Sequence, residues 1–255
     1  MTPRLDPAFL GAPIAHRALH DVQDGRPENS RAAISAAIDH GYGIEIDVQL
    51  SADNHAMVFH DYSLDRLAEG SGPIHAVSSV ALAKTPLRGG SEGIPELEEV
   101  LDLVAGRVPL LIEIKDQDGG MGENIGPLEE RTARALTNYS GPVAVMSFNP
   151  HSVARMADLC PDIARGLVTS AYHAADWPLP ATTRERLRDI PDYDRVGASF
   201  VSHEAPDLSR PRIAELKAAG AHILCWTIKS PEAEAEARKI AENVTFEGYL
   251  AVPPG

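Results

Sequence analysis

The sequence predicts an α/β protein, a single-domain (β/α)₈ barrel over residues 1–255. Two observations support this fold class. Short apolar segments that read as buried strands alternate with helical patterns along the chain, and 255 residues is about the usual length of such a barrel. A doubly wound open sheet is the alternative, but the sequence lacks the glycine-rich turn with which many of those sheets bind nucleotides.

Eight apolar segments are expected to form the strands. In chain order they are residues 13–16, 43–50, 108–114, 143–148, 164–168, 195–199, 222–226 and 248–252. A shorter apolar run, 56–60, follows Asp53-Asn54, a pair that tolerates the backbone conformations of a tight turn. This turn predicts a hairpin in which Asp47 lies opposite His60.

Helices are expected between these strands because capping residues mark their ends. Segment 95–105 carries apolar residues at i, i+3, i+4 and i+7, and Gly106 follows it as a stop signal. At 149–150 and 230–231, a residue that caps helix N-termini precedes a proline suited to the first turn. Another helix is bracketed within 209–220 by a serine and a glycine.

Two segments fit neither pattern. Residues 68–93, rich in Gly, Ser and Pro, are expected to form a short insertion, and residues 169–181 carry aromatic side chains and two prolines. In a (β/α)₈ barrel both would be loops at the C-terminal ends of the strands, where barrel enzymes carry their active sites.

Composition excludes several classes of function. The net charge of −14, without a run of Lys or Arg, argues against nucleic-acid binding. The N-terminal residues lack a signal-peptide pattern, and no segment approaches the roughly 20 apolar residues of a membrane span. Cys160 and Cys225 lack metal-ligand spacing and are expected to be buried thiols in a reducing compartment. We therefore expect a cytoplasmic protein without stable membrane insertion, either a monomer or a homo-oligomer.

Three carboxylates are expected at the ends of neighbouring strands. Glu45 and Asp47 are two residues apart, so their side chains project from the same face of a strand. Glu113 and Lys115 repeat this spacing. Charged groups are costly inside a sheet unless they are paired or bind a metal. Since oxygen ligands suit a hard divalent cation, we predict that the three acids bind one; the alternative is salt bridges with Arg17 or Lys115.

Two of the ten histidines are candidates for acid–base chemistry. His16 and His60 each end an apolar segment, and beside a cation they can form an acid–base pair because imidazole titrates near neutral pH. Arg17 and Lys115 would then supply positive charge to a phosphate oxygen. His203 follows the sixth strand and is a further candidate for substrate contact. Six others are interpreted as surface, capping or packing positions: His20, His40, His55, His75, His151 and His222.

Eight short motifs between residue 14 and about residue 230 carry most of these candidates. They are His16-Arg17-Ala18, Pro27-Glu28-Asn29-Ser30, Glu45-Ile46-Asp47-Val48, His60-Asp61, Ile94-Pro95-Glu96-Leu97-Glu98-Glu99, Glu113-Ile114-Lys115, Ser147-Phe148 and Trp226-Thr227. In order and content they resemble the motifs of the glycerophosphodiester phosphodiesterase family. The resemblance implies a TIM-barrel fold and a Mg²⁺ or Ca²⁺ ion held by the three carboxylates. It also implies general acid–base catalysis by the two strand-end histidines, with Arg17 and Lys115 on the phosphate.

The activity implied by the resemblance is hydrolysis of a small glycerophosphodiester to glycerol 3-phosphate and an alcohol. One histidine would deprotonate a nucleophile, and the other would protonate the leaving alkoxide. Phe148 and Trp226 either contact this substrate or pack in the core. The sequence leaves open the leaving alcohol, the choice between Mg²⁺ and Ca²⁺, and which histidine is the acid.

Three other functions are compatible with parts of the pattern. A lysophospholipase D or sphingomyelinase-D-like enzyme would use the same site on a lipid, but only Tyr172, Trp177 and Leu179 hint at an apolar entrance. An amidohydrolase-type metal hydrolase is disfavoured because His-x-His is absent from the first strand. A noncatalytic phosphate-binding barrel is disfavoured because both histidines and all three carboxylates are present.

Three departures from the family pattern bear on substrate choice rather than on the catalytic groups. Ala18 replaces the glycine that follows His-Arg in the family, and its Cβ is expected to restrict the loop or narrow the approach to the phosphate. The segment between His60 and Ile94 is shorter than usual. The C-terminal residues GYLAVPPG lack the family's Asp-Gly-Ile-Ile-Thr-Asp-x-Pro pattern.

Overall fold

The computed structural model describes residues 2–252 and has the (β/α)₈ barrel expected from the sequence. Eight parallel strands form the barrel wall in the spatial order β1-β9-β8-β7-β6-β5-β4-β2, and β1 pairs with β2 to close it. These strands are β1 (Ile14–Ala15), β2 (Gly43–Leu50), β4 (Leu110–Ile114), β5 (Val143–Ser147), β6 (Ala164–Thr169), β7 (Phe200–Glu204), β8 (His222–Ile228) and β9 (Asn243–Phe246). A short strand, β3 (Ala56–Val58), pairs antiparallel with the end of β2.

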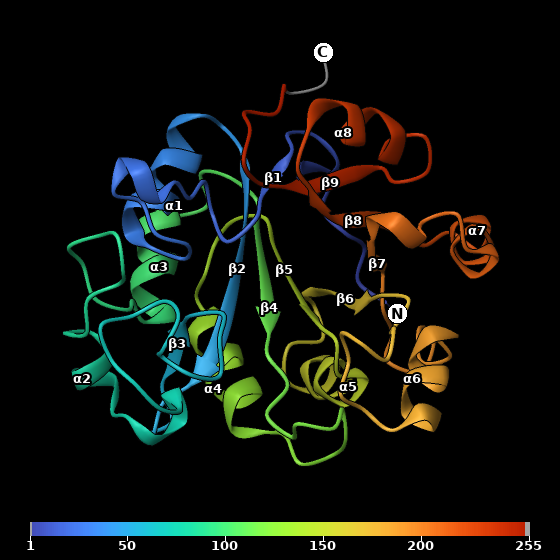
Figure 1. Ribbon diagram of the computed structural model, residues 1–255. Helices are drawn as coiled ribbons and strands as arrows, with labels where there is room; N and C mark the ends of the chain where they lie inside the picture. The colour runs from blue at the N-terminus through green and yellow to red at the C-terminus, as the bar shows by residue number, and fades with distance from the viewer. Residues whose placement is uncertain (1, 253–255) are drawn as a thin grey trace.

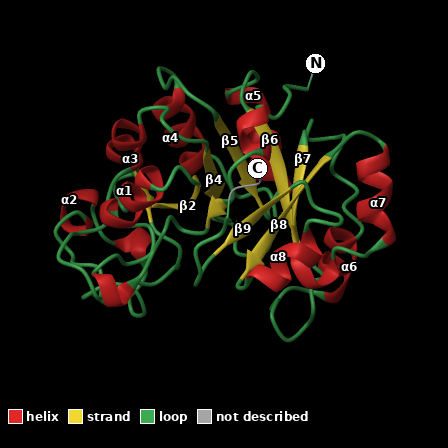
Figure 2. Cartoon of the chain, turned by 90° about the horizontal axis from the view of Figure 1, so that it is seen from above, coloured by secondary structure: helices red, strands yellow, loops and turns green. Residues whose placement is uncertain are grey.

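Helices surround this wall (Figures 1 and 2). They are α1 (Arg31–Asp39), α3 (Leu97–Val104), α4 (Pro127–Leu136), α5 (Pro150–Leu159), α6 (Ala181–Arg188), α7 (Pro211–Ala218) and α8 (Pro231–Ala237). As predicted, the side chains of Asn149 and Ser230 accept backbone hydrogen bonds at the starts of α5 and α8. Ala105, with a φ of 48°, ends α3 one residue before Gly106.

The two faces of the barrel wall belong to different apolar clusters. Ile44 and Ile46 of β2 belong to the cluster that includes the helices, whereas Leu111 and Phe200 belong to a second cluster that fills the interior. Because side chains alternate along a strand, Glu45 and Asp47, which lie between and beyond these isoleucines, point into the barrel. The sequence of β2 thus directs carboxylates to the inside and aliphatic side chains to the helices.

The segment before β1 closes the interior at the end where the barrel strands begin. Leu5 and Phe9 belong to the interior cluster, and Phe9 lies in a short 3₁₀ helix, η1 (Pro7–Leu10). Asn243, at the start of β9, donates from Nδ2 to the Phe9 carbonyl at 2.7 Å and to the Ala12 carbonyl at 2.9 Å. A buried polar side chain therefore ties this segment to the last strand.

Two of the eight predicted strands were misplaced. Residues 195–199 lie in a turn in which Gly197 has a φ of 58°, and β7 starts directly after them. Residues 248–252 follow the last strand, which ends before Gly248 at a φ of 79°. In both places buried apolar residues outside the strand imitate the strand pattern, such as Val196 and Ala251. The last three residues of the divergent C-terminal segment, 253–255, lie outside the described part of the chain.

The hairpin register and segment 68–93 also differ from expectation. Phe59, not His60, lies opposite Asp47, because the Phe59 N–H donates to the Asp47 carbonyl at 2.9 Å. Residues 68–93 are more than a loop: they contain α2 (Ser79–Leu82) and contribute to an apolar cluster of their own. Figure 2 places α2 at the periphery of the molecule. Residues 68–93 therefore form a small packed unit beside the barrel.

The cysteines and the helices bear on two further expectations. Among residues 2–252, no helix has the length and apolar character needed to cross a membrane. Cys225 is buried as expected, Cys160 is only half-buried, and both thiols are free. Burial raises the pKa of Cys225 to about 12, so this thiol stays protonated at neutral pH.

Candidate active site

A pocket of about 440 Å³ opens at the C-terminal ends of the barrel strands. Nine of the ten site residues predicted from the sequence line it, and closure of the barrel brings them together from distant parts of the chain. They are His16, Arg17, Glu45, Asp47, His60, Glu113, Lys115, Phe148 and Trp226.

Three buried carboxylates converge in this pocket. Glu45 and Asp47 are each 1% exposed, and Glu113 is 7% exposed. The parallel pairing of β2 with β4 sets Asp47 beside Glu113, and one oxygen of each acid lies within 4.8 Å of the others. Lys115 Nζ lies 2.7 Å from Asp47 Oδ1 and 2.6 Å from Glu113 Oε1. Asp47 and Glu113 therefore form the salt bridges with Lys115 that were the alternative to a metal site. Glu45 instead accepts a hydrogen bond from the Arg17 backbone N–H at 2.8 Å.

The electrostatics of the cluster favour a bound cation. Burial raises the pKa of Glu45 well above its usual range, and the negative charges of Asp47 and Glu113 raise it further. Burial would also raise the pKa of Asp47, but nearby basic groups, above all Lys115, hold it well below its usual range. The cluster therefore has more carboxylate than its basic neighbours neutralise. Three carboxylate oxygens are donors that Mg²⁺ and Ca²⁺ prefer, so these residues fit such an ion.

Each histidine of the pocket has a carboxylate at its Nδ1 atom. His16 Nδ1 is 2.5 Å from Glu247 Oε2, and His60 Nδ1 is 2.7 Å from Asp61 Oδ1. An ionised carboxylate accepts hydrogen bonds, so Nδ1 is the donor in both pairs and Nε2 of each ring is left for the pocket. Burial lowers the pKa of His16, and its hydrogen bond to Glu247 opposes that effect.

A chain of ion pairs connects Arg17 to His60. Arg17 Nη1 donates to Glu28 Oε1 at 2.8 Å. Arg66 donates to Glu28 at 3.1 Å and to Asp61 at 2.6 Å. Asp61 in turn holds His60. The same chain of ion pairs therefore holds two groups of the pocket. They are the Arg17 guanidinium, which is expected to contact phosphate, and the His60 imidazole.

The next residues of the same motif hold other parts of the site. Asn29, with a φ of 61°, donates from Nδ2 to Asp47 Oδ2 at 3.0 Å. Ser30 accepts from the Ala33 N–H and caps α1. The motif that begins at Pro27 thus orients a basic group, a carboxylate and the first helix in turn.

Comparisons with known proteins agree with this arrangement. The sequence model of the glycerophosphoryl diester phosphodiesterase family matches residues 16–246. The chain belongs to this family. The YhdW protein of Bacillus subtilis is 29% identical over 247 residues, which cover 92% of this chain and 93% of YhdW. A glycerophosphodiester phosphodiesterase of Caldanaerobacter subterraneus is 32% identical over 175 residues, 64% of this chain and 69% of that relative.

The solved structure of another phosphodiesterase is similar over nearly the whole chain. It is a phosphodiesterase from Oleispira antarctica in complex with the product sn-glycerol-3-phosphate. Its sequence is 25% identical, the TM-score is 0.75, and the match covers 94% of both chains. A solved structure from Galdieria sulphuraria, at 18% identity and a TM-score of 0.74, has the same fold.

The structure shows the surroundings of Ala18, one of the three positions at which this phosphodiesterase departs from the family pattern. Ala18, which replaces the family's glycine, has a φ of 63°, in the left-handed region that glycine adopts most easily. Arg17 before it has a φ of 50°. The Ala18 side chain is buried and packs in the helix-facing cluster, and it does not line the pocket. The expected narrowing of the phosphate approach is therefore not observed. The effect of the methyl group is on backbone conformation, because a residue with a Cβ is held at a positive φ.

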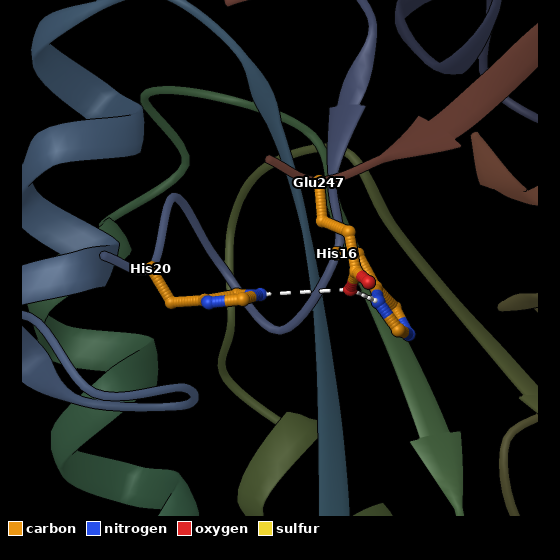
Figure 3. A group of neighbouring side chains, drawn as sticks. All are labelled: His16, His20 and Glu247. Atoms are coloured by element: carbon orange, nitrogen blue, oxygen red, sulfur yellow. Dashed lines mark hydrogen bonds and ion pairs between the residues drawn. The ribbon is translucent and has the colours of Figure 1, made fainter. Parts of the chain in front are cut away.

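Sequence reasoning missed the partners of His16. Glu247 follows β9 directly, and His20, interpreted as a surface or packing residue, has its Nε2 atom 3.6 Å from Glu247 Oε2 (Figure 3). The signal that identified His16 and His60, a charged residue at the end of an apolar segment, also applies to Glu247. A last strand predicted at 248–252 puts Glu247 before a strand rather than at its end, so the signal does not identify Glu247.

The remaining candidates have distinct surroundings. His203 is fully buried, lies 2.8 Å from Thr169 Oγ1 and 3.2 Å from Asp207 Oδ2, and does not line the pocket. Phe148 and Trp226 both line the pocket, with ring centroids 5.6 Å apart in an edge-to-face arrangement. They contribute an apolar part of a lining that otherwise carries charged groups.

Proposed function

We propose that this protein is a metal-dependent phosphodiesterase that hydrolyses a small glycerophosphodiester to glycerol 3-phosphate and an alcohol. The observation that carries the proposal is the convergence of three buried carboxylates and two carboxylate-held histidines on one pocket. Family membership and the product in the Oleispira complex support the same reaction.

Glu45, Asp47 and Glu113 would hold the cation, either Mg²⁺ or Ca²⁺. When bound, such an ion offsets negative charge that develops on the phosphate oxygens. Arg17 and Lys115 line the same pocket and would bind those oxygens through charge-assisted hydrogen bonds. Because the Arg17 guanidinium is already held by ion pairs, little of its conformational freedom would be lost on binding.

His16 and His60 would exchange protons with the substrate. One Nε2 would remove the proton of the attacking hydroxyl, which belongs either to water or to the substrate's own glycerol, and the other Nε2 would give a proton to the leaving alkoxide. Attack by water gives glycerol 3-phosphate directly. Attack by the glycerol hydroxyl gives a cyclic phosphodiester, which a water molecule then opens to glycerol 3-phosphate with the two histidines in reversed roles. Glu247 and Asp61 accept from Nδ1 of the two rings and so stabilise each imidazolium while it carries the extra proton.

A small water-soluble diester is favoured over a lipid. Tyr172 and Leu179, the residues that hinted at an apolar entrance, are buried in a cluster packed against Phe148 and Trp177. They therefore offer no apolar surface to an acyl chain.

The test compares chelated and metal-restored protein on glycerophosphocholine and on a lysolipid, with glycerol 3-phosphate as the measured product. We expect release from glycerophosphocholine only with Mg²⁺ or Ca²⁺, and a fall of at least about 10²-fold in His16→Ala. His222→Ala is the matched control, because that ring pairs with Glu242 away from the pocket. Metal-independent turnover, or no turnover of either substrate, would overturn the proposal. Turnover of the lysolipid alone would replace it with the lipid-acting alternative.

A further inference from the structure

Strand pairing fixes the position of Glu247 beside a pocket residue, although Glu247 does not itself line the pocket. β1 and β9 run parallel with Ala15 beside Phe246, and the His16 N–H donates to the Phe246 carbonyl at 2.9 Å. The Glu247 N–H donates to the Ile228 carbonyl at 2.9 Å. The two side chains therefore start from neighbouring strand ends whose backbones are both held by the sheet.

Basic groups hold the Glu247 carboxylate from several sides. Oε2 lies 2.5 Å from His16 Nδ1 and 3.6 Å from His20 Nε2, and Figure 3 shows the two rings on either side of the carboxylate. Oε1 lies 2.8 Å from Lys229 Nζ. The contacts with His16 and His20 keep the pKa of Glu247 well below its usual range, so the carboxylate is ionised wherever an imidazole titrates.

An ionised carboxylate at Nδ1 determines which nitrogen of the His16 ring carries the hydrogen. The carboxylate cannot donate, so Nδ1 must, and a neutral imidazole has a single N–H. Nε2 therefore keeps its lone pair. Arg17 and Asp47 are the other charged groups that act on this ring, and their effects on its charge have opposite signs.

We propose that Glu247 is the positioning residue of His16: it fixes the orientation and tautomer of the ring so that an unprotonated Nε2 faces the phosphodiester. His20 and Lys229 hold the carboxylate in place for this task. The inference rests on the proposed function because it concerns the same histidine. Glu247 acts through His16 and does not contact the substrate.

The chain contains a matched control for this inference. Glu242 and Glu247 flank the same strand, β9, and Glu242 Oε2 lies 2.9 Å from Nδ1 of His222. That pair lies at the opposite end of the barrel. We expect Glu247→Gln to lower kcat by between about 10-fold and about 10⁴-fold, the upper value being the cost of removing a carboxylate that fixes the tautomer of a catalytic histidine, with KM nearly unchanged. Glu242→Gln should leave both constants unchanged.

Nitrogen NMR of histidine-labelled protein tests the tautomer without turnover. The His16 signals, assigned by their loss in His16→Gln, should show a protonated Nδ1 and an unprotonated Nε2 in the neutral ring. In Glu247→Gln they should shift toward a mixture of tautomers. Glu247→Asp keeps an acceptor and should restore the tautomer and part of kcat, and it serves both readouts should the glutamine variant fail to fold.

Two results would overturn the inference. One is a wild-type tautomer and kcat in Glu247→Gln; the other is an equal loss of kcat in Glu242→Gln, which would indicate a general structural effect. Absence of turnover in the wild-type protein would instead remove the proposed function, and the NMR comparison would still decide what Glu247 does to the ring.

Discussion

Replacing Lys115 by methionine should destabilise the metal-free protein by about 3–5 kcal/mol. The Lys115 side chain is 9% exposed, and its Nζ atom lies within 2.7 Å of both Asp47 and Glu113. Removal of one partner from a buried ion pair leaves an uncompensated buried charge, and that charge is the source of the cost. Here two carboxylates lose the same partner, so we expect the upper half of this range.

A divalent cation should return part of that stability. The bound ion would supply positive charge next to the same carboxylates. At an ion concentration about 100 times its Kd, binding to the folded state adds about 2.7 kcal/mol. Since the variant lacks the competing ammonium group, its gain on addition of Mg²⁺ or Ca²⁺ should exceed that of the wild type. Urea unfolding followed by circular dichroism, with chelator and with each ion, measures both quantities.

Lys239→Met provides the control for this prediction. Lys239 pairs with Glu236 at 2.7 Å, but its side chain is 65% exposed, so the change should cost less than about 1 kcal/mol. An equally small loss in Lys115→Met would refute the reasoning about the buried cluster. A large loss that neither ion reduces would refute the cation site.

Three further predictions concern single positions. Because the pKa of Glu45 is raised by burial and by acidic neighbours, the metal-free protein should lose stability as the pH rises from the ordinary carboxylate range through the raised value. Glu45→Gln should remove this loss, seen as a higher urea midpoint than the wild type at alkaline pH with chelator; a lower midpoint would contradict it. Ala18→Gly should change stability by less than about 1 kcal/mol, because relief of the left-handed backbone offsets the loss of a buried methyl group, and it should leave kcat unchanged. Gly166→Ala should cost about 1–3 kcal/mol in the same unfolding assay, since the new Cβ would overlap the Phe200 ring inside the barrel; an unchanged midpoint would argue against that packing.

The sequence predicted well the features that depend on local alternation. In β2, aliphatic residues alternate with Glu45 and Asp47, and the pattern alone indicates that both acids share a face. The hairpin register could not be predicted in this way. It depends on how many residues the turn uses, and here the turn between Leu50 and Ala56 includes Asn54 at a φ of 60°. The difference of one residue replaced His60 by Phe59 opposite Asp47.

Non-local pairings explain the other omissions. His16 and Glu247 are 231 residues apart and meet only because the last strand returns to the first. The true last strand, with polar Asn243 and Thr245, reads less like a strand than the apolar residues beyond it. The surroundings of His203 could not be predicted either, because its partner Thr169 lies on a neighbouring strand, 34 residues away in the sequence.

The way the ends of the chain join the barrel has a practical consequence for anyone who trims it. The family match spans residues 16–246, yet Phe9 and Ile14 before it fill the interior and Glu247 after it holds a pocket histidine. A recombinant fragment cut at the match boundaries would lack Phe9 and Ile14, which fill one end of the barrel interior. It would also lack Glu247, which bonds His16 at the other end. Weak activity in such a fragment would reflect the cut sites rather than the enzyme.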